Sequence, residues 1–291
     1  MTRACALACG VAALAMCAPA YAQGNSQDHN KKPQNPPPSK SDLPTPGVAP
    51  VATVTGVTPF AWIDDATLVE PGSVSLTMSV VRWQGAGISE VDVPVVDAAI
   101  GVAPRVHLTA TVPRVVGSVD PSGAAGGVGT SYFGVKIALL NESKRSIKLS
   151  VAPMLELLGR GVMQSLSAGE RRAHFGLPAS IEASRGPARL YGGAGYFSRG
   201  IWFTGGAVGV RTTDKVYVSA GYSRSWRTND AVDVPLSDRA RTELTGGAAY
   251  ALTPTVSVLG SIGRTIATLD QNGAGTTVAA GVALAFTPAV K

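Results

Sequence analysis

The stretch Ser73-Val-Ser-Leu-Thr-Met-Ser-Val80 decides the fold of this chain. Apolar side chains at every second position, from Val74 to Val80, alternate with the hydroxyl-bearing side chains of Ser and Thr. Successive side chains of a β-strand point to opposite faces, so the stretch predicts a strand with one apolar face and one hydroxyl-bearing face.

The same alternation recurs along the chain. Together with less regular segments it gives twelve predicted strands, at 73–81, 91–102, 105–112, 133–139, 147–151, 177–182, 188–197, 201–211, 215–222, 241–251, 256–265 and 277–286. An even number of antiparallel strands brings both termini of the barrel segment to the same side of the membrane. We therefore predict an all-β fold, a transmembrane antiparallel up-and-down β-barrel of about 12 strands over residues 70–286. A soluble β-sandwich is the alternative.

The lengths of the connections favour the barrel. Every second connection is short: 103–104, 141–146, 185–187, 212–214 and 252–255. The others are long, at 84–90, 117–129, 159–173, 227–239 and 266–275, with 198–200 as the exception. Outer-membrane barrels have short periplasmic turns and long external loops, whereas a sandwich has no reason to alternate in this way. The parity predicts that the N- and C-termini are periplasmic.

The N-terminus predicts export. Arg3 is followed by a short apolar run and by Ala20-Tyr-Ala22, which is typical of a signal peptide over residues 1–22. All three cysteines lie within this segment, so a mature chain starting at Gln23 has no thiol. In a competing interpretation, Cys17 is the lipidated first residue of a lipoprotein.

Three further segments lie outside the predicted barrel. Residues 23–50, rich in Pro, Asn, Gln and Lys, predict a disordered, Pro-rich periplasmic linker, either a passive spacer or a contact to peptidoglycan. Residues 51–69 form a transitional segment, either a plug that enters the lumen or a short amphipathic helix. Residues 287–291 are a C-terminal tail.

Composition narrows the class of protein. The charged fraction is 15%, against about 25% in ordinary soluble domains. Beyond the signal peptide no run reaches the roughly 20 apolar residues of a membrane-spanning helix, which excludes a helical inner-membrane protein. The net charge of +6 comes from scattered Lys and Arg in an exported chain, so no nucleic-acid partner is predicted.

Aromatic residues lie near the predicted strand ends, where outer-membrane barrels carry girdles at the lipid interfaces. The alternative is that they are ordinary core residues. The girdle candidates are Trp83, Phe175, Phe197, Trp202 and Trp226 at the outer side, and Tyr250 and Phe286 at the periplasmic side.

Charged residues within the strands are predicted to face the lumen, because a Lys or Arg against mid-membrane hydrocarbon costs roughly 2–4 kcal/mol. They form either a mildly cationic lining that selects solutes or an internal ionic network that blocks flow. The lumen-lining candidates are Arg105, His107, Lys136, Lys148, Glu182, Arg189, Lys215, Arg241 and Glu243.

The sequence carries no catalytic signature. His29 lies in the linker, and neither His107 nor His174 has a Ser or Asp at a spacing that identifies a triad. Asp64-Asp65 is typical of a turn or a helix cap rather than a metal site. We predict that the protein is not an enzyme, with no cofactor and no bound metal.

Two stretches carry a family resemblance. Glu70-Pro-Gly-Ser-Val-Ser-Leu-Thr-Met78 and the C-terminal hairpin, from Tyr250-Ala-Leu-Thr-Pro254 to Gly281-Val-Ala-Leu-Ala-Phe286, resemble the outer-membrane family of the meta-pathway of phenol degradation, grouped with fatty-acid and hydrocarbon channels. The resemblance implies a porin-like barrel in the outer membrane of a Gram-negative bacterium that passes small, often apolar compounds. Many outer-membrane chains end on an aromatic residue that the assembly machinery reads, whereas here Phe286 is followed by five further residues.

Two functions follow as hypotheses. The first is a channel or transporter that passes small molecules, hydrophobic ones included, by passive diffusion. The second is a closed structural or adhesive barrel with no transport role. The expected partners are outer-membrane lipid, an unidentified small solute, the outer-membrane assembly machinery and, through the linker, peptidoglycan.

Overall fold

The computed structural model describes residues 64–85, 88–118, 127–141, 147–159, 171–198, 200–228, 241–268 and 275–287. The predicted signal peptide, the linker, residues 51–63 and all three cysteines lie outside the described residues. The described residues contain no helix long and apolar enough to cross a membrane. Their strands are β1 (Val74–Gly85), β2 (Ile88–Ala103), β3 (Val106–Ser118), β4 (Gly127–Val128), β5 (Ser131–Asn141), β6 (Ile147–Val151), β7 (Met154–Leu157), β8 (Ala173–Arg185), β9 (Ala188–Phe197), β10 (Ile201–Arg211), β11 (Val216–Arg227), β12 (Arg241–Thr253), β13 (Val256–Thr268) and β14 (Gly275–Phe286).

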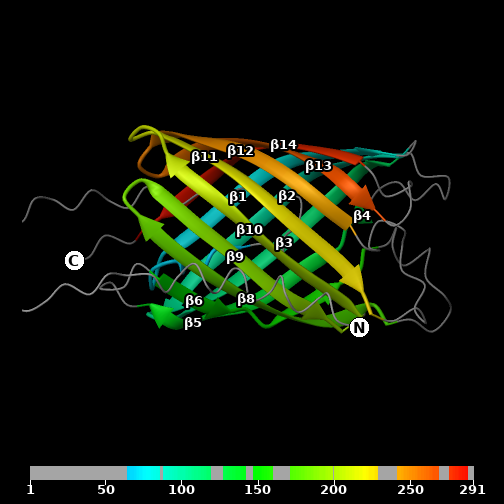
Figure 1. Ribbon diagram of the computed structural model, residues 1–291, viewed down its shortest axis with the longest axis horizontal. Helices are drawn as coiled ribbons and strands as arrows, with labels where there is room; N and C mark the ends of the chain where they lie inside the picture. The colour runs from blue at the N-terminus through cyan, green and yellow to red at the C-terminus, as the bar shows by residue number, and fades with distance from the viewer. Residues whose placement is uncertain are drawn as a thin grey trace, which may run out of the picture. The chain divides into compact units, whose positions relative to one another are not determined.

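These strands form a closed, all-antiparallel barrel of twelve strands, which confirms the predicted fold class (Figure 1). The first and last strands close it, with pairing from Val74 opposite Phe286 to Gly85 opposite Gly275. Closure leaves neither strand with an unpaired edge, which a membrane interior requires because it offers no water to backbone groups.

One position in the wall is shared by two short strands. Both β6 and β7 pair with β5 on one side and with β8 on the other. Ala152 and Pro153 separate them, and Pro153 has no N–H to give to the ladder. The predicted strand at 147–151 therefore continues, after this break, to Leu157. The two-residue strand β4 pairs only with the end of β3.

The two ends of the barrel differ. The short turns at 104–105, 186–187, 212–215 and 254–255 lie at one end, at the left in Figure 1, which we call the turn end. The register places Val74 and Phe286 there too. At the opposite end, the loop end, the described strands stop before residues 119–126, 160–170, 229–240 and 269–274, which lie outside the described residues.

The predicted long connection at 84–90 is wrong. β1 runs to Gly85 and β2 begins at Ile88, with these two residues paired, so only two residues separate the strands. The second strand is correspondingly longer than 91–102 and carries a register shift between Asp92 and Val95. That shift contains the cis peptide bond Val93–Pro94. The shift moves the residues before Pro94 out of phase with those after it, which obscured the alternation in the sequence.

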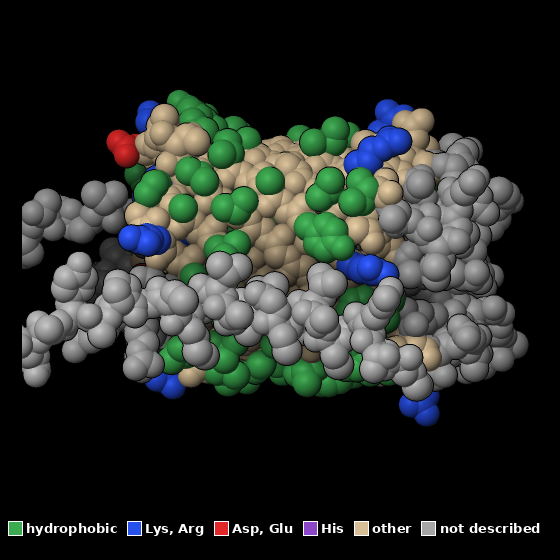
Figure 2. Space-filling view, viewed as in Figure 1, with side chains coloured by type: hydrophobic (Ala, Val, Ile, Leu, Met, Phe, Trp, Pro, Cys, Tyr) green, Lys and Arg blue, Asp and Glu red, His purple; other side chains and the backbone are tan. Residues whose placement is uncertain are grey.

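The alternation in the sequence gives the barrel wall an apolar outer face and a polar inner face. Apolar side chains such as Met78, Val80 and Ile262 are exposed on the outside, whereas Ser79 and Ser180 are buried inside. In the face shown in Figure 2, the middle of the wall carries hydrophobic and uncharged groups, and Lys and Arg lie at the two ends. This distribution is the one a lipid bilayer requires of a barrel.

Candidate pore and the segment that enters it

The chain enters the barrel before it forms the first strand. Residues 64–70 lie inside the wall at the turn end, where Asp65 and Ala66 are buried. The backbone of Glu70 passes over Gly101 of β2, and a Cβ atom at Gly101 would overlap the Glu70 carbonyl oxygen. The N–H of Gly72 donates to the Gly101 carbonyl at 2.7 Å. Residues 64–69 are the described part of the predicted transitional segment, and they contain no helix.

Two aspartates fasten this segment to the wall. Asp64 Oδ2 lies 2.6 Å from Lys136 Nζ of β5, and Asp65 Oδ2 lies 2.6 Å from Arg189 Nη2 of β9. Lys136 Nζ also lies 3.7 Å from Asp65 Oδ1. Removing one partner of such a buried pair leaves an uncompensated charge, which is strongly destabilising. The segment is therefore held on opposite-charge contacts to two strands.

A second set of contacts involves Thr67 and Glu182. The Thr67 hydroxyl donates to Glu182 Oε2 at 2.6 Å and accepts from Lys148 Nζ at 2.8 Å. Glu182 also pairs with Arg189 at 3.0 Å and with Lys148 at 3.4 Å. These residues form what we call the plug network: Asp64, Asp65, Thr67, Lys136, Lys148, Glu182 and Arg189.

Asp65 combines a local and a long-range role. Its Oδ1 accepts from the Thr67 N–H at 2.9 Å, which is an Asx turn, so the predicted turn role of this pair is present. Burial raises the pKa of the Asp65 carboxyl above its usual range, and the Lys136 ammonium opposes that rise. The nearby cations are therefore what favours the charged form of this side chain.

A cavity lies next to the plug network inside the barrel. It is small, about 20 Å³, which is room for about one water molecule. Tyr191 and Tyr217 line it, with Ser219, Ser261 and the small inward residues of β10 to β13 around them. Tyr217 crosses the inner face above Gly209, where a Cβ atom would overlap the phenol hydroxyl. Small residues thus leave room in the lumen that larger side chains would fill.

An apolar cluster lies inside the barrel toward the loop end. Phe197, Ile201 and Phe203 are buried there, with Tyr132 and Met154 packed against them. The Tyr132 hydroxyl donates to Glu156 Oε1 at 3.1 Å. The described lumen therefore has an ionic part near the turn end and an apolar part nearer the loop end.

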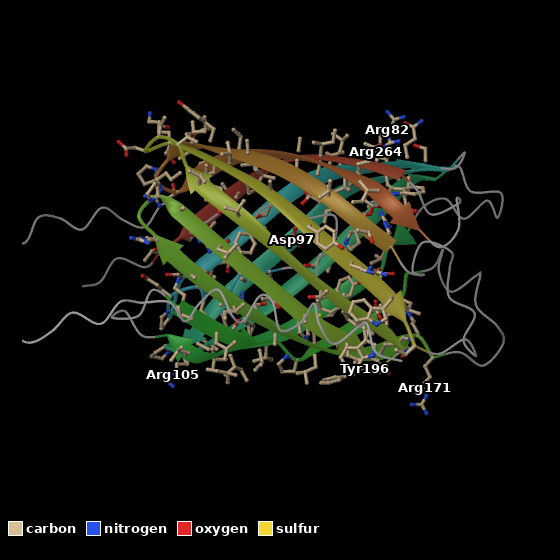
Figure 3. All side chains as sticks on the ribbon, in the orientation of Figure 1. Arg82, Asp97, Arg105, Arg171, Tyr196 and Arg264 are labelled. Atoms are coloured by element: carbon tan, nitrogen blue, oxygen red, sulfur yellow. The ribbon has the colours of Figure 1, made fainter. Side chains whose placement is uncertain are left out.

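The lumen-lining candidates fall into two groups. His107, Lys136, Lys148, Glu182, Arg189, Arg241 and Glu243 lie on the inner face of the wall, where Arg241 and Glu243 form an ion pair. Arg105 and Lys215 instead lie in the short turns before β3 and β11 with exposed side chains (Figure 3 for Arg105), so they do not line the lumen as expected. The alternating pattern reaches one residue beyond each strand, so it includes Arg105 and Lys215 although both belong to turns.

The aromatic candidates also divide. Phe175, Trp202, Tyr250 and Phe286 are exposed on the outer face, and Trp226 pairs with Trp202 on the same face. Phe197 is fully buried in the lumen cluster, so its expected place in a girdle is wrong. Trp83 shares the inner face with Ser79, and its indole Nε1 is buried. Tyr196, which the sequence analysis did not single out, lies outside against Trp202 with ring centroids 4.9 Å apart (Figure 3).

The two described histidines are both in contact with main-chain atoms. His107 Nδ1 accepts from the Val69 N–H at 3.0 Å, which adds a further contact to the entering segment. His174 is near the loop end, with Nε2 2.8 Å from the Arg171 carbonyl oxygen. Within the described ranges, no three His, Cys, Asp or Glu side chains are grouped so that they could hold a metal ion.

Sequence reasoning missed the role of Asp64, Asp65 and Thr67 in the lumen. Adjacent acids followed by Thr are common in turns, and their partners are 72 to 124 residues away in the chain. One signal in the sequence pointed to these acids. The predicted inward cations outnumber the two predicted inward glutamates, so further acids from outside the strands are needed to balance their charge.

Comparison with solved structures places the fold among outer-membrane β-barrels. The NanC porin is 10% identical with a TM-score of 0.53, and the alignment covers 72% of this chain and 98% of the porin. The COG4313 outer-membrane channel of Pseudomonas putida F1 is 16% identical with a TM-score of 0.55, covering 79% of this chain and all of the channel. No protein-family model and no curated protein matches the sequence. At these identities the similarity shows the fold alone.

Proposed function

We propose that this protein is a channel of the Gram-negative outer membrane that passes small molecules, hydrophobic ones included, by passive diffusion. The observation that carries the proposal is the segment at residues 64–70, which lies inside a closed barrel beside a small cavity and is held by ion pairs rather than by packed apolar side chains. Breaking these ion pairs would displace the segment without breaking the strand pairing that closes the barrel.

The proposal includes location and orientation. Exposed apolar side chains around the wall and outward aromatic residues such as Trp202 and Phe286 support insertion in a bilayer. Short turns at the end that holds Val74 and Phe286 support periplasmic termini, since short turns are periplasmic in outer-membrane barrels. Assembly by the outer-membrane machinery and a peptidoglycan contact through residues 23–50 belong to the same proposal.

The solute class rests on two supports. One is the resemblance to the family of the meta-pathway of phenol degradation, whose members pass small apolar compounds. The other is the apolar character of the lumen toward the loop end, where Phe197, Ile201 and Phe203 are buried inside the barrel. The role proposed is transport rather than catalysis.

Single-channel recording in planar bilayers tests the channel. The native protein is compared with the double variant Asp64→Asn, Asp65→Asn, which removes both charges from the entering segment and leaves the wall unchanged. We expect a small conductance for the native protein and a higher or more frequently open one for the variant, because Lys136 and Arg189 no longer hold the segment.

The control is Asp214→Asn, in an exposed turn. We expect it to conduct as the native protein does. If correctly folded native protein and the double variant both carry no current, the barrel is closed, and the structural or adhesive role replaces the channel.

A further inference from the structure

Two arginines lie on the outer face of the wall near the loop end. Arg82 is three residues before the end of β1, and Arg264 is four residues before the end of β13; both are exposed. Figure 3 shows them close together, pointing away from the barrel. Each follows an outward apolar residue two positions nearer the turn end, Val80 at 45% and Ile262 at 58% exposure. The guanidinium groups therefore continue the lipid-facing surface toward the loop end.

The hydrogen-bond partners of the two arginines are neutral and adjacent. Arg82 Nη2 donates to Gln84 Oε1 at 3.2 Å, and Arg264 Nη1 donates to Thr276 Oγ1 at 2.8 Å. Gln84 and Thr276 are directly opposite each other in the pairing of β1 with β14, and Thr276 is opposite Arg264 in the pairing with β13. The four residues form one strip across three strands, which we call the arginine strip. A guanidinium has five donors, so most of them stay available to a ligand.

No described carboxylate balances this charge on the outer face. Glu90, Asp92, Asp97, Glu156, Glu182 and Glu243 belong to the inner face, Asp64 and Asp65 to the entering segment, and Glu70 and Asp214 to the turn end. Arg224 adds another outward cation near the same end. Among the described residues the charges are thus separated: the acids lie inside or at the turn end, and Arg82, Arg224 and Arg264 lie outside toward the loop end.

We infer that the arginine strip is a binding site for the phosphate groups of the outer-leaflet lipid. This rests on the proposed placing of the barrel, with the loop end outward. Arginine binds phosphate in a bidentate manner through charge-assisted hydrogen bonds, and its long apolar stem lies along a lipid-facing surface while the head reaches the polar boundary. The ligand is a lipid rather than a soluble anion, because the strip continues an apolar wall and lies outside the lumen.

Lipid binding is measured on the full chain, refolded in detergent and checked for folding by its heat-dependent shift on a gel. The probe is diphosphorylated lipid A, with binding followed by native mass spectrometry, and dephosphorylated lipid A as the second probe. We expect the double variant Arg82→Gln, Arg264→Gln to bind the diphosphorylated form about tenfold more weakly, which corresponds to about 1.4 kcal/mol, because it loses both guanidinium groups of the strip. We expect the native protein to lose a similar factor for the dephosphorylated form.

The matched control is Arg185→Gln, Arg211→Gln, which removes two exposed arginines at the turn end. It retains native affinity if the site is the arginine strip. Equal affinity in native protein and the Arg82, Arg264 variant, or the same loss in the control, would overturn the inference. Displacement of lipid A by equimolar inorganic phosphate would also overturn it, because the site would then be one for a soluble anion. Conductance of the same samples separates this result from the channel proposal.

Discussion

Lys136 is almost completely buried, yet it carries a charge that two carboxylates share. Its ammonium is 2.6 Å from Asp64 Oδ2 and 3.7 Å from Asp65 Oδ1. A buried cation is tolerated only with such partners, because the interior gives it no water. At the scale of single residues, the wall and the entering segment therefore depend on each other for charge balance.

Replacing Lys136 by Met removes the ammonium while roughly keeping the length of the side chain. We expect a loss of about 3–5 kcal/mol in the free energy of unfolding, because Asp65 remains buried beside Glu182 with one cation fewer. Urea unfolding in lipid vesicles, followed by tryptophan fluorescence, measures this loss.

Lys215→Met is the matched control, since Lys215 is exposed in a turn. Its free energy of unfolding should stay near the native value. A triple variant that also carries Asp64→Asn and Asp65→Asn should recover part of the loss. Equal stabilities for Lys136→Met and Lys215→Met would show that the ion pairs do not hold the segment.

At the scale of elements, period-two alternation gives each strand its two faces. Particular residues cause the breaks and register shifts that interrupt this alternation. Pro153 divides β6 from β7, and the shift around Pro94 changes the phase of β2. Gly101 of β2 is required by a close approach, because the backbone of Glu70 occupies the space a side chain would need. The entering segment and the strand thus fit only with glycine at this position.

Gly101→Ala tests this fit. The new Cβ would overlap the backbone of Glu70 and Val69, so we expect residues 64–70 to shift and loosen the plug network. Conductance should rise relative to the native protein, and protease added from the turn-end side should cut the segment faster.

Gly117→Ala is the matched control, because the added Cβ would meet only Val91 Cβ, at 4.0 Å. It should leave both measurements unchanged. If Gly101→Ala keeps native conductance and native protease resistance, the position of the segment does not depend on its close approach to Gly101.

At the scale of the whole molecule, the described residues form a barrel whose outside is apolar and whose inside is polar, apart from the apolar cluster around Phe197. The outward apolar residues of different strands line up only because the barrel closes between β1 and β14. In a bilayer, the cost of an outward charge depends on its depth, so the position of the membrane can be measured on the wall itself.

Ile262→Arg and Leu252→Arg measure that depth. Ile262 is at the middle of β13 and outward, whereas Leu252 is outward next to the turn-end terminus of β12. We expect a destabilisation of about 2–4 kcal/mol for Ile262→Arg and about 0–1 kcal/mol for Leu252→Arg, measured by unfolding from lipid vesicles. Equal costs at the two positions would contradict a bilayer centred on the middle of the strands.

The sequence by itself determined the class of fold, the strand count and the two faces, because alternation is local and each strand shows it in its own residues. It also placed most of the inward charges, such as Lys136 and Glu182, since a charge within an alternating strand has one acceptable side. Predictions from the sequence were wrong where the local pattern ends. Arg105, predicted to line the lumen, lies in a turn, and Phe197, predicted to belong to a girdle, lies in the lumen.

Only the tertiary structure decided that Asp64 and Asp65 meet Lys136 and Arg189, that Gly101 gives the segment its passage, and that Arg82 and Arg264 lie together. Each of these contacts joins residues far apart in the chain. The physical reason is that partners across a barrel are set by register, closure and strand tilt, which no local pattern of residues encodes.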